Sequence, residues 1–169
     1  IDVMVMLRIS KAPFVFVGKK ELVKIPFFGF LYKRSAIMVD RSNSKSRYGV
    51  YGRADKLISK GYSICIFPEN NYLDETILLN PFKHGAFKIA IEYQMPIFPL
   101  VFLDCKRKFP WSLTHGFPGS LRVKFLDIIP TLEKTEIDIN FLKEDTFKTI
   151  HKELLNDPKQ ASLEAISIW

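Results

Sequence analysis

Residues 62–69 read Tyr-Ser-Ile-Cys-Ile-Phe-Pro-Glu, an apolar run that ends in a proline and a carboxylate. The run is short, and Lys60 and Gly61 precede it like the end of a helix, so we expect a buried strand. Pro68 cannot donate to a β-ladder and ends that strand. Glu69 then lies at the carboxyl end of the strand, where open α/β sheets bind their ligands. A solvated loop glutamate is the alternative.

Two further apolar runs, earlier in the chain, also lead into polar residues. Residues 14–17 lead to Lys19, and residues 36–39 lead to Asp40 and Arg41. Predicted strands alternate with predicted helices, which favours an α/β fold with a mainly parallel or mixed sheet covered by helices on both faces. Neighbouring parallel strands end at the same edge, so we expect the three polar groups to converge there. Two cations beside a carboxylate suit a phosphate monoester with a nearby hydroxyl.

The rest of the chain divides into predicted helices and strands at its Pro and Gly residues. Helices are expected at 2–10, between 44 and 60, from Pro81 to Pro96, and at 146–155; strands are expected at 97–103 and 121–129. Residues 106–120 are expected to form a loop. The length of 169 residues suits a single domain with a substantial core.

The charge of the chain is concentrated in its first third. Residues 1–60 hold thirteen Lys or Arg and four acidic residues, a net charge of +9 against +7 for the whole chain. Such asymmetry favours an anionic partner, although a solvated basic surface is the alternative. Nucleic acid is disfavoured because no recognition motif accompanies the charge. A nucleotide is disfavoured because neither G-x-G-x-x-G nor a P-loop is present.

The two cysteines have no metal-ligand spacing, which argues against a zinc site or a disulfide framework. We expect Cys65 to be a small core residue and Cys105 to lie in a polar turn. No apolar stretch reaches the roughly 18 residues that a membrane span needs, and no signal peptide is recognised at Ile1.

Four blocks of residues follow one another along the chain. They are Ile1-Asp2; Lys19 with Leu22, Pro26 and Gly29, then Val39-Asp40-Arg41; Phe67-Pro68-Glu69 with Phe82-Lys83-His84-Gly85; and Pro96-Ile97-Phe98-Pro99-Leu100. In order and spacing they resemble the motifs of the glycerolipid acyltransferase family: the end of His-x4-Asp, Lys-x2-Leu-x3-Pro-x2-Gly…Asp-Arg, Phe-Pro-Glu-Gly-Thr-Arg…Phe-Lys-x-Gly, and Pro-Ile-x-Pro-Val. The resemblance covers about residues 1–135 and is to the 1-acylglycerol-3-phosphate (lysophosphatidic acid) acyltransferases in particular.

The resemblance implies a reaction and a role for each matching residue. A fatty acyl group passes from acyl-CoA or acyl-carrier protein to the sn-2 hydroxyl of 1-acylglycerol-3-phosphate, giving phosphatidic acid with no cofactor and no metal. A histidine acts as general base and Asp2 orients it. Lys19 and Arg41 hold the phosphate, and Glu69 positions the glycerol. Gly85 allows close approach of the backbone or acyl chain, with tight helix packing as the alternative.

The sequence departs from the family pattern in two places. If Asp2 ends the His-x4-Asp motif, the catalytic histidine lies upstream of Ile1, and we expect the chain to lack the N-terminal part of an acyltransferase domain. Residues 136–169 are then a C-terminal helical extension of the single domain 1–169. The histidines within the chain are expected to be structural or exposed: His84, His115 and His151. Residues 70–72 are Asn-Asn-Tyr where the family has Gly-Thr-Arg, which leaves another acceptor lysolipid open.

The segment 25–32 is strongly aromatic and flanked by basic residues, which suits either core filling or an interfacial membrane patch. The resemblance implies a membrane-associated protein at the cytoplasmic face. Its partners would be a lysophospholipid, an acyl thioester donor and the membrane surface, and not nucleic acid. A non-catalytic module that binds anionic lipid or phosphate is the alternative.

Overall fold

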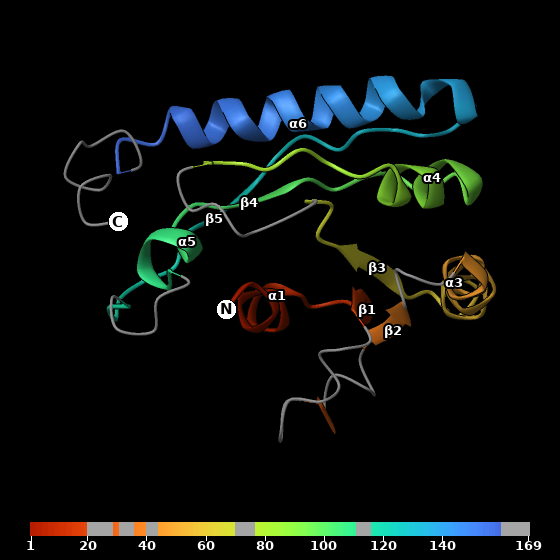
Figure 1. The fold of residues 1–169 in the computed structure, drawn as a ribbon, viewed down its shortest axis with the longest axis horizontal. Helices are drawn as coiled ribbons and strands as arrows, with labels where there is room; N and C mark the ends of the chain where they lie inside the picture. Colours follow the sequence, from red (N-terminus) through yellow and green to blue (C-terminus); the bar gives the residue numbers. More distant parts are fainter. Residues whose placement is uncertain (20–28, 31–35, 40–43, 70–76, 111–115, 160–169) are drawn as a thin grey trace. The chain divides into compact units, whose positions relative to one another are not determined.

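The structure is a computed structural model of the chain, and it describes residues 1–19, 29–30, 36–39, 44–69, 77–110 and 116–159. The chain folds into two compact units (Figure 1). One comprises residues 1–7 together with the chain from Pro68 onward, and the other comprises residues 8–67. Helix α1 (Asp2–Ile9) begins in the first of these units and ends in the second.

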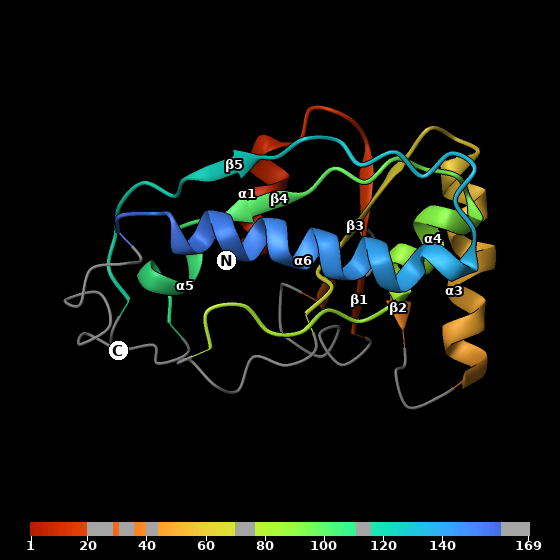
Figure 2. The same ribbon diagram turned by 90° about the horizontal axis from the view of Figure 1, so that it is seen from above.

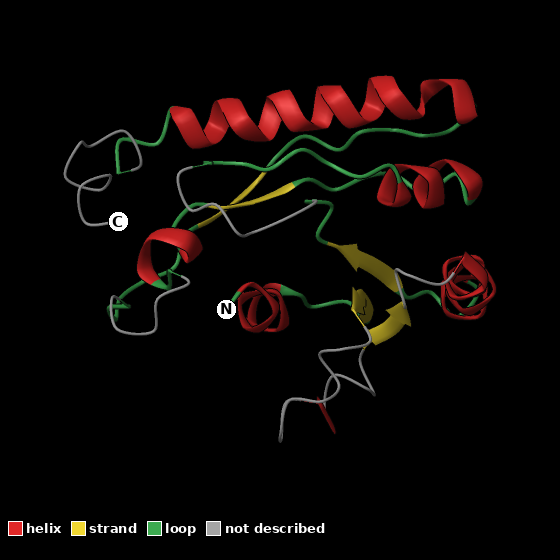
Figure 3. Cartoon of the chain, in the orientation of Figure 1, coloured by secondary structure: helices red, strands yellow, loops and turns green. Residues whose placement is uncertain are grey.

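The unit of residues 8–67 contains a three-stranded parallel sheet, shown in yellow in Figure 3. Its strands are β1 (Phe14–Lys19), β2 (Ala36–Val39) and β3 (Ser63–Ile66), in the order β2-β1-β3. The register pairs Phe16 with Ala36 and Val17 with Ile66. Because all three strands run the same way, their carboxyl ends lie at one edge, as predicted from the apolar runs.

Helix α3 (Ser44–Ile58) packs against β2 and β3 and completes this unit. Ala54 is fully buried, and Arg53 donates a hydrogen bond of 2.9 Å to the carbonyl oxygen of Met38. Gly61 follows the helix with φ of 78°, and its N–H donates to the carbonyl oxygen of Ile58 at 2.8 Å. This left-handed conformation favours glycine after a helix, so Gly61 ends the helix as predicted.

The other unit has its core between α4 (Gly85–Glu92) and α6 (Ile139–Leu155). Phe82, Phe87, Ile91 and Leu142 form the buried cluster. Strands β4 (Leu100–Phe102) and β5 (Val123–Phe125) are antiparallel, and α6 runs along β4 and α4 (Figure 2). The remaining elements are α5 (Cys105–Lys108) and the 3-10 turn η2 (Glu136–Asp138).

Pro81 does not begin the helix that follows it, contrary to the prediction. Helix α4 begins at Gly85, because Phe82 pairs with Glu69 in an isolated antiparallel bridge. The N–H of Lys83 donates to the carbonyl oxygen of Pro68 at 2.8 Å and strengthens the same pairing. Tertiary pairing therefore outweighs the preference of proline for the first turn of a helix.

The other differences concern lengths and one missed helix. Strands β4 and β5 are three residues each, and beyond them Ile97 and Ile129 meet only in an isolated bridge. Helix α6 begins at Ile139, earlier than the predicted start at Thr146. Cys105 opens the short helix α5 instead of lying in a polar turn.

The predicted α/β class with a mixed set of strands is confirmed. In the described part of the chain, no helix is both long and apolar enough to cross a bilayer.

Candidate active site

Glu69 is held at its position by the segment that follows the undescribed residues 70–76. The backbone N–H of Asn80 donates to Oε2 of Glu69 at 3.0 Å, and the side-chain amide of Asn80 lies 3.4 Å from the same oxygen. Asn80 is buried, and the bridge between Glu69 and Phe82 fixes the backbone on both sides. Both hydrogen bonds reach Oε2, so the carboxylate is oriented through one oxygen while Oε1 receives neither.

The pKa of the Glu69 carboxyl is raised above its ordinary value, chiefly by burial. The negative charge of Asp2 raises it further, whereas the hydrogen bonds from Asn80 and the positive charge of Lys106 lower it. The opposing effects leave a net rise. A carboxylate that is half-buried beside another carboxylate is destabilised in its charged form, as is common at sites that bind or activate a substrate.

Asp2 stands in the first turn of α1, and its charge acts on the thiol of Cys105. Cys105 is only 4% exposed. Burial first, and then the charge and hydrogen bond of Asp2, raise the pKa of this thiol to about 12. A thiol that keeps its proton at neutral pH is a weak nucleophile, so Cys105 is unsuited to carry an acyl group.

Lys106, next to Cys105 on α5, supplies positive charge to this region. Its ammonium group donates a hydrogen bond to the carbonyl oxygen of Ile77, the first described residue after residues 70–76. Its charge also acts on Glu69 and opposes the rise in the pKa of that carboxyl. The structure therefore brings together Asp2, Glu69, Asn80, Cys105 and Lys106, all within one unit.

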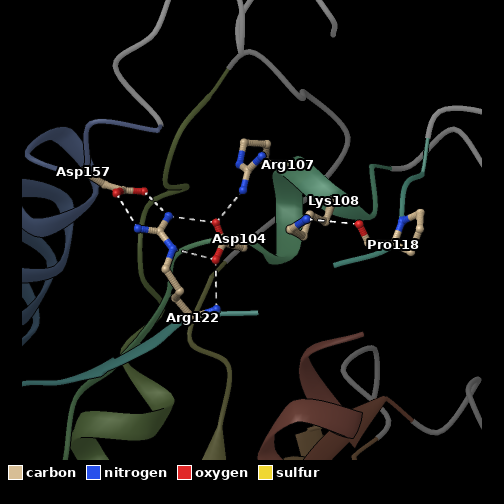
Figure 4. A network of polar contacts seen from close by, with 6 residues as sticks. All are labelled: Asp104, Arg107, Lys108, Pro118, Arg122 and Asp157. Carbon is tan, nitrogen blue, oxygen red and sulfur yellow. Dashed lines mark hydrogen bonds and ion pairs between the residues drawn. The ribbon is translucent and has the colours of Figure 1, made fainter. Parts of the chain in front are cut away.

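An ion network just before Cys105 anchors α5 (Figure 4). Asp104 is 1% exposed and accepts hydrogen bonds from the guanidinium groups of Arg107, at 2.7 Å, and Arg122, at 2.8 Å. The backbone N–H of Arg122 donates to it as well, at 2.8 Å. Arg122 also forms a bidentate pair with Asp157, at 2.8 and 2.7 Å. The network links α5, the start of the β5 segment and the end of α6.

The charges of this network are stabilised in their ionised forms. Burial alone would raise the pKa of Asp104, but the hydrogen bonds from Arg122 and Arg107 outweigh it and hold the pKa well below the ordinary value. Hydrogen bonds from Arg122 likewise lower the pKa of Asp157. In return, Asp104 and Asp157 raise the pKa of Arg122. Bidentate arginine–carboxylate pairs of this kind combine energy with geometric specificity.

The other predicted site residues have different outcomes. Lys19 ends β1 at the carboxyl edge of the parallel sheet, paired in register with Val39, but its side chain is not described. Arg41 and residues 70–72 lie outside the described residues, as does most of the aromatic segment 25–32. Gly85 is exposed at the start of α4, and a Cβ added there would meet no described atom within 4 Å. Among the described residues, nothing packs closely against this position, so the structure gives no support to the alternative of tight helix packing at Gly85.

Of the two described histidines, His84 contacts α6 and His151 lies within it. Nε2 of His84 lies 2.8 Å from Oδ1 of Asn140, and His151 stacks on Phe147 with 5.6 Å between ring centroids. Both contacts fit the structural roles expected for these residues, and His115 lies outside the described residues. Among the described residues, no group of three or more His, Cys, Asp or Glu side chains is placed to hold a metal ion.

Sequence reasoning missed Asn80, Cys105 and Lys106 as members of this site. Asn80 precedes a proline and was expected only in a loop. Cys105 stands among the charged residues 104–108, a composition typical of a solvated turn. The one available signal was that a small apolar residue interrupts that charged run.

Comparison with known proteins adds a family match. A profile described as Acyltransferase matches residues 1–103. The chain is 42% identical to a 1-acyl-sn-glycerol-3-phosphate acyltransferase of Haemophilus influenzae, over 76% of the chain and 53% of that protein. It is 30% identical to a putative 1-acyl-sn-glycerol-3-phosphate acyltransferase of Caenorhabditis elegans, over 95% of the chain and 58% of that protein.

A solved structure has the same fold. The 1-acyl-sn-glycerophosphate acyltransferase PlsC of Thermotoga maritima superposes with a TM-score of 0.68, over 90% of this chain and 60% of that chain, at 17% sequence identity. At this identity the likeness concerns the fold alone. The chain spans between about half and three fifths of the length of these relatives.

Proposed function

This chain belongs to the acyltransferase family, and we propose that the protein transfers a fatty acyl group to the sn-2 hydroxyl of 1-acylglycerol-3-phosphate. The donor is an acyl thioester, either acyl-CoA or acyl-carrier protein, and the product is phosphatidic acid. The observation that carries the proposal is the acyltransferase profile match over residues 1–103, which includes Asp2 and Glu69. These are the two carboxylates that the resemblance assigns to the reaction.

The reaction assigns a different task to each carboxylate. The acceptor hydroxyl attacks the thioester carbonyl, a carbon–oxygen bond forms, and the carbon–sulfur bond breaks. A histidine base takes the hydroxyl proton and returns it to the departing thiolate, while Asp2 orients the histidine. Glu69, fixed through Oε2, offers Oε1 to the glycerol of the acceptor. Holding the hydroxyl in line with the carbonyl lowers the barrier by removing unproductive orientations.

The phosphate of the acceptor is assigned to basic side chains. Lys19 and Arg41 follow the carboxyl ends of neighbouring parallel strands, which supports a common role for them. Lys106 contributes a further positive charge near Glu69. We place the protein at the cytoplasmic face of a membrane, because its acceptor is a lipid and the first third of the chain is strongly basic.

The second candidate is a module that binds anionic lipid or phosphate without catalysis. The basic first third of the chain supports it. It predicts lysophosphatidic acid binding without turnover, whereas the enzyme predicts turnover.

The test measures acyl transfer from a thioester to a panel of lysolipids by the full-length protein, with any residues that naturally precede Ile1. Vesicles present lysophosphatidic acid, other lysophospholipids or lyso-amino-lipids. We expect turnover with lysophosphatidic acid, a raised KM for it in Arg41→Ala, and lower activity in Glu69→Ala. Lys159→Ala, far along the chain from these motifs, is the matched basic control and should retain the wild-type KM. Unchanged kinetics in both site variants, with the fold intact, would refute the site assignment.

A further inference from the structure

We propose that the protein docks on anionic lipid bilayers through a basic and aromatic surface formed by α5 and the segment that folds back on it. This surface, the α5 patch, comprises Arg107, Lys108, Phe109, Phe117 and Pro118. It gives the membrane a defined contact on the described part of the chain. Lipid binding at the patch does not depend on the proposed function, whereas its effect on acyl transfer rests on that function.

The sequence around α5 carries positive charge and no acidic residue. Residues 105–126 include five Lys or Arg and no Asp or Glu, although residues 61–169 as a whole hold twelve basic and fourteen acidic residues. Arg107 pairs with the buried Asp104, but no carboxylate of the described residues forms an ion pair with Lys108. The phosphates of an anionic bilayer attract such a local excess of cations.

Two aromatic rings are exposed on the same surface. Phe109 is 52% exposed and Phe117 is 41% exposed. The backbone holds the two segments together, because the N–H of Phe117 donates to the carbonyl oxygen of Lys108 at 3.1 Å. A Cβ added at Gly116 would lie 3.7 Å from the ring of Phe109. Exposed rings that lie on one surface can enter the boundary between headgroups and acyl chains together.

The cations of the patch lie directly beside these rings. The ammonium nitrogen of Lys108 is 4.5 Å from the centroid of the Phe117 ring, and the guanidinium carbon of Arg107 is 5.6 Å from it. Lys108 also donates to the carbonyl oxygen of Pro118 at 3.3 Å (Figure 4). When the ring reaches the acyl boundary, these cations remain at the level of the lipid phosphates.

Exposed apolar side chains without this charge are present elsewhere in the same unit. Leu132, Ile137 and Phe141 are even more exposed than the rings of the α5 patch. Residues 131–145, however, hold five acidic residues and only two Lys, so an anionic bilayer repels them. Charge therefore selects the α5 patch. The bilayer is favoured over an acidic carrier protein because the acceptor of the proposed reaction is itself a membrane lipid.

The experiment attaches a nitrobenzoxadiazole fluorophore to Phe117→Cys in the full-length protein and records its emission with vesicles. The vesicles contain phosphatidylcholine alone or mixed with anionic phosphatidylglycerol. Phe141→Cys, labelled in the same way, is the matched control. The native thiols compete little for the label at pH 7, because burial raises the pKa of Cys65 and of Cys105 to about 12.

We expect the emission of the label at position 117 to shift to shorter wavelength with anionic vesicles and to stay unchanged with neutral ones. The label at position 141 should not respond to either. Adding Lys108→Gln to Phe117→Cys should raise the vesicle concentration at the midpoint of the shift about fivefold, the effect of one cation near an anionic surface. Lys148→Gln, at an exposed lysine of α6, should leave that midpoint within about twofold.

A second measurement tests the effect on acyl transfer. The double variant Phe109→Ser with Phe117→Ser should transfer acyl groups to lysophosphatidic acid in anionic vesicles about tenfold more slowly than the wild type, and at the wild-type rate in detergent micelles. The double variant Ile137→Ser with Phe141→Ser is the control and should retain both rates. Urea unfolding verifies that each variant is folded.

The inference is overturned if the label at position 117 is silent, or if it responds equally to neutral and anionic vesicles. A response to acyl-carrier protein without lipid would also overturn it, because the patch would then dock the donor. If the label responds as expected but no lysolipid is acylated, the docking surface stands and the proposed function fails. If acyl transfer occurs and the label is silent, the proposed function stands and the docking surface fails.

Discussion

Asp104 and Glu69 are carboxylates of the same unit in opposite electrostatic situations. Asp104 is almost completely buried, yet two guanidinium groups hold its pKa well below the ordinary value. Glu69 is only half-buried, yet its pKa is raised, because Asn80 and Lys106 do not offset burial and the charge of Asp2. Burial by itself raises the pKa of both carboxyl groups. The difference lies in the number and geometry of the cationic partners.

The contrast distinguishes the structural network around Asp104 from the candidate site around Glu69. The Asp104–Arg122–Asp157 network satisfies its charges internally and stabilises the fold that carries α5. The centre around Glu69 leaves a carboxylate with an unfavourable charge, which a bound substrate can relieve. Residues 104, 105 and 106 pass from the first cluster to the second within one turn of α5. The structural network thus supports the site directly.

The strongest test of the contrast removes the arginine that joins the two buried aspartates. Arg122→Ala should lower the free energy of unfolding by about 3 kcal/mol, because breaking a buried ion pair leaves uncompensated charge. The loss is limited because Arg107 still pairs with Asp104 in the variant. The measurement is urea unfolding at pH 7. Arg122→Lys is the control, because it keeps the positive charge but loses the bidentate guanidinium group. Its free energy of unfolding should lie between those of the wild type and Arg122→Ala.

The pH dependence of the stability lost in Arg122→Ala tests whether ionised Asp104 is the cause of that loss. Asp104 has a folded pKa below its ordinary value of 3.8, so its stabilising contribution is present above pH 3.8 and is lost as pH falls further. The gap between wild type and Arg122→Ala should therefore be full at pH 7 and should close in acid, as the Asp104 carboxyl takes up a proton. A gap that is already closed at pH 5 would show that the network does not stabilise the fold through ionised Asp104.

The second test removes the charge of Glu69 and keeps its acceptor. In Glu69→Gln the amide oxygen still accepts from Asn80, so we expect lower acyl transfer, by about tenfold or more, together with a higher free energy of unfolding at pH 7. The folded pKa of Glu69 is raised, so the wild type loses stability as pH rises from its ordinary value of 4.5 through that folded pKa. The stability gained by the variant should vanish below pH 4.5. If Glu69→Gln is less stable than wild type at pH 7, the ionised carboxylate of Glu69 stabilises the fold as that of Asp104 does, and the contrast between the two residues fails.

The smallest effect is expected at an ion pair outside both regions. Glu136 lies 3.0 Å from Lys88, but the side chains are 76% and 42% exposed. Exposed pairs in water are screened and contribute little, so Glu136→Gln should leave the free energy of unfolding and the acyl transfer rate unchanged within error. If Glu136→Gln lost as much free energy of unfolding as Arg122→Ala, then burial and bidentate geometry would not explain why the Asp104–Arg122–Asp157 network stabilises the fold.

The sequence predicted the parallel part of the fold well and the rest less well. Runs such as 14–17 and 36–39 are apolar, short and bounded by breakers, and both are strands at or near those residues. Pro81 was misread, because the pairing of Glu69 with Phe82 is a contact across a long loop that local preference does not encode. Strands β4 and β5 are shorter than their apolar runs, since the pairing ends before the apolar residues do.

The residues of the candidate site were also predicted only in part from the sequence. Glu69 was predicted to be a site residue from its place after a strand, and Asp2 from its motif, and the roles assigned to them stay predictions. Cys105 was expected in a polar turn and Lys106 went unnoticed, because nothing local distinguishes a buried residue of a short helix from one in a charged turn.

The sequence by itself determined the α/β class and the family, because these depend on local periodicity and on short motifs with fixed spacing. Only the tertiary structure decided which charges meet. Asp104, Arg122 and Asp157 are distant along the chain and each reads as an ordinary surface charge, yet folding buries two of them and pairs all three. The energy of a charge depends on its burial and its partners, and these exist only once the chain has folded.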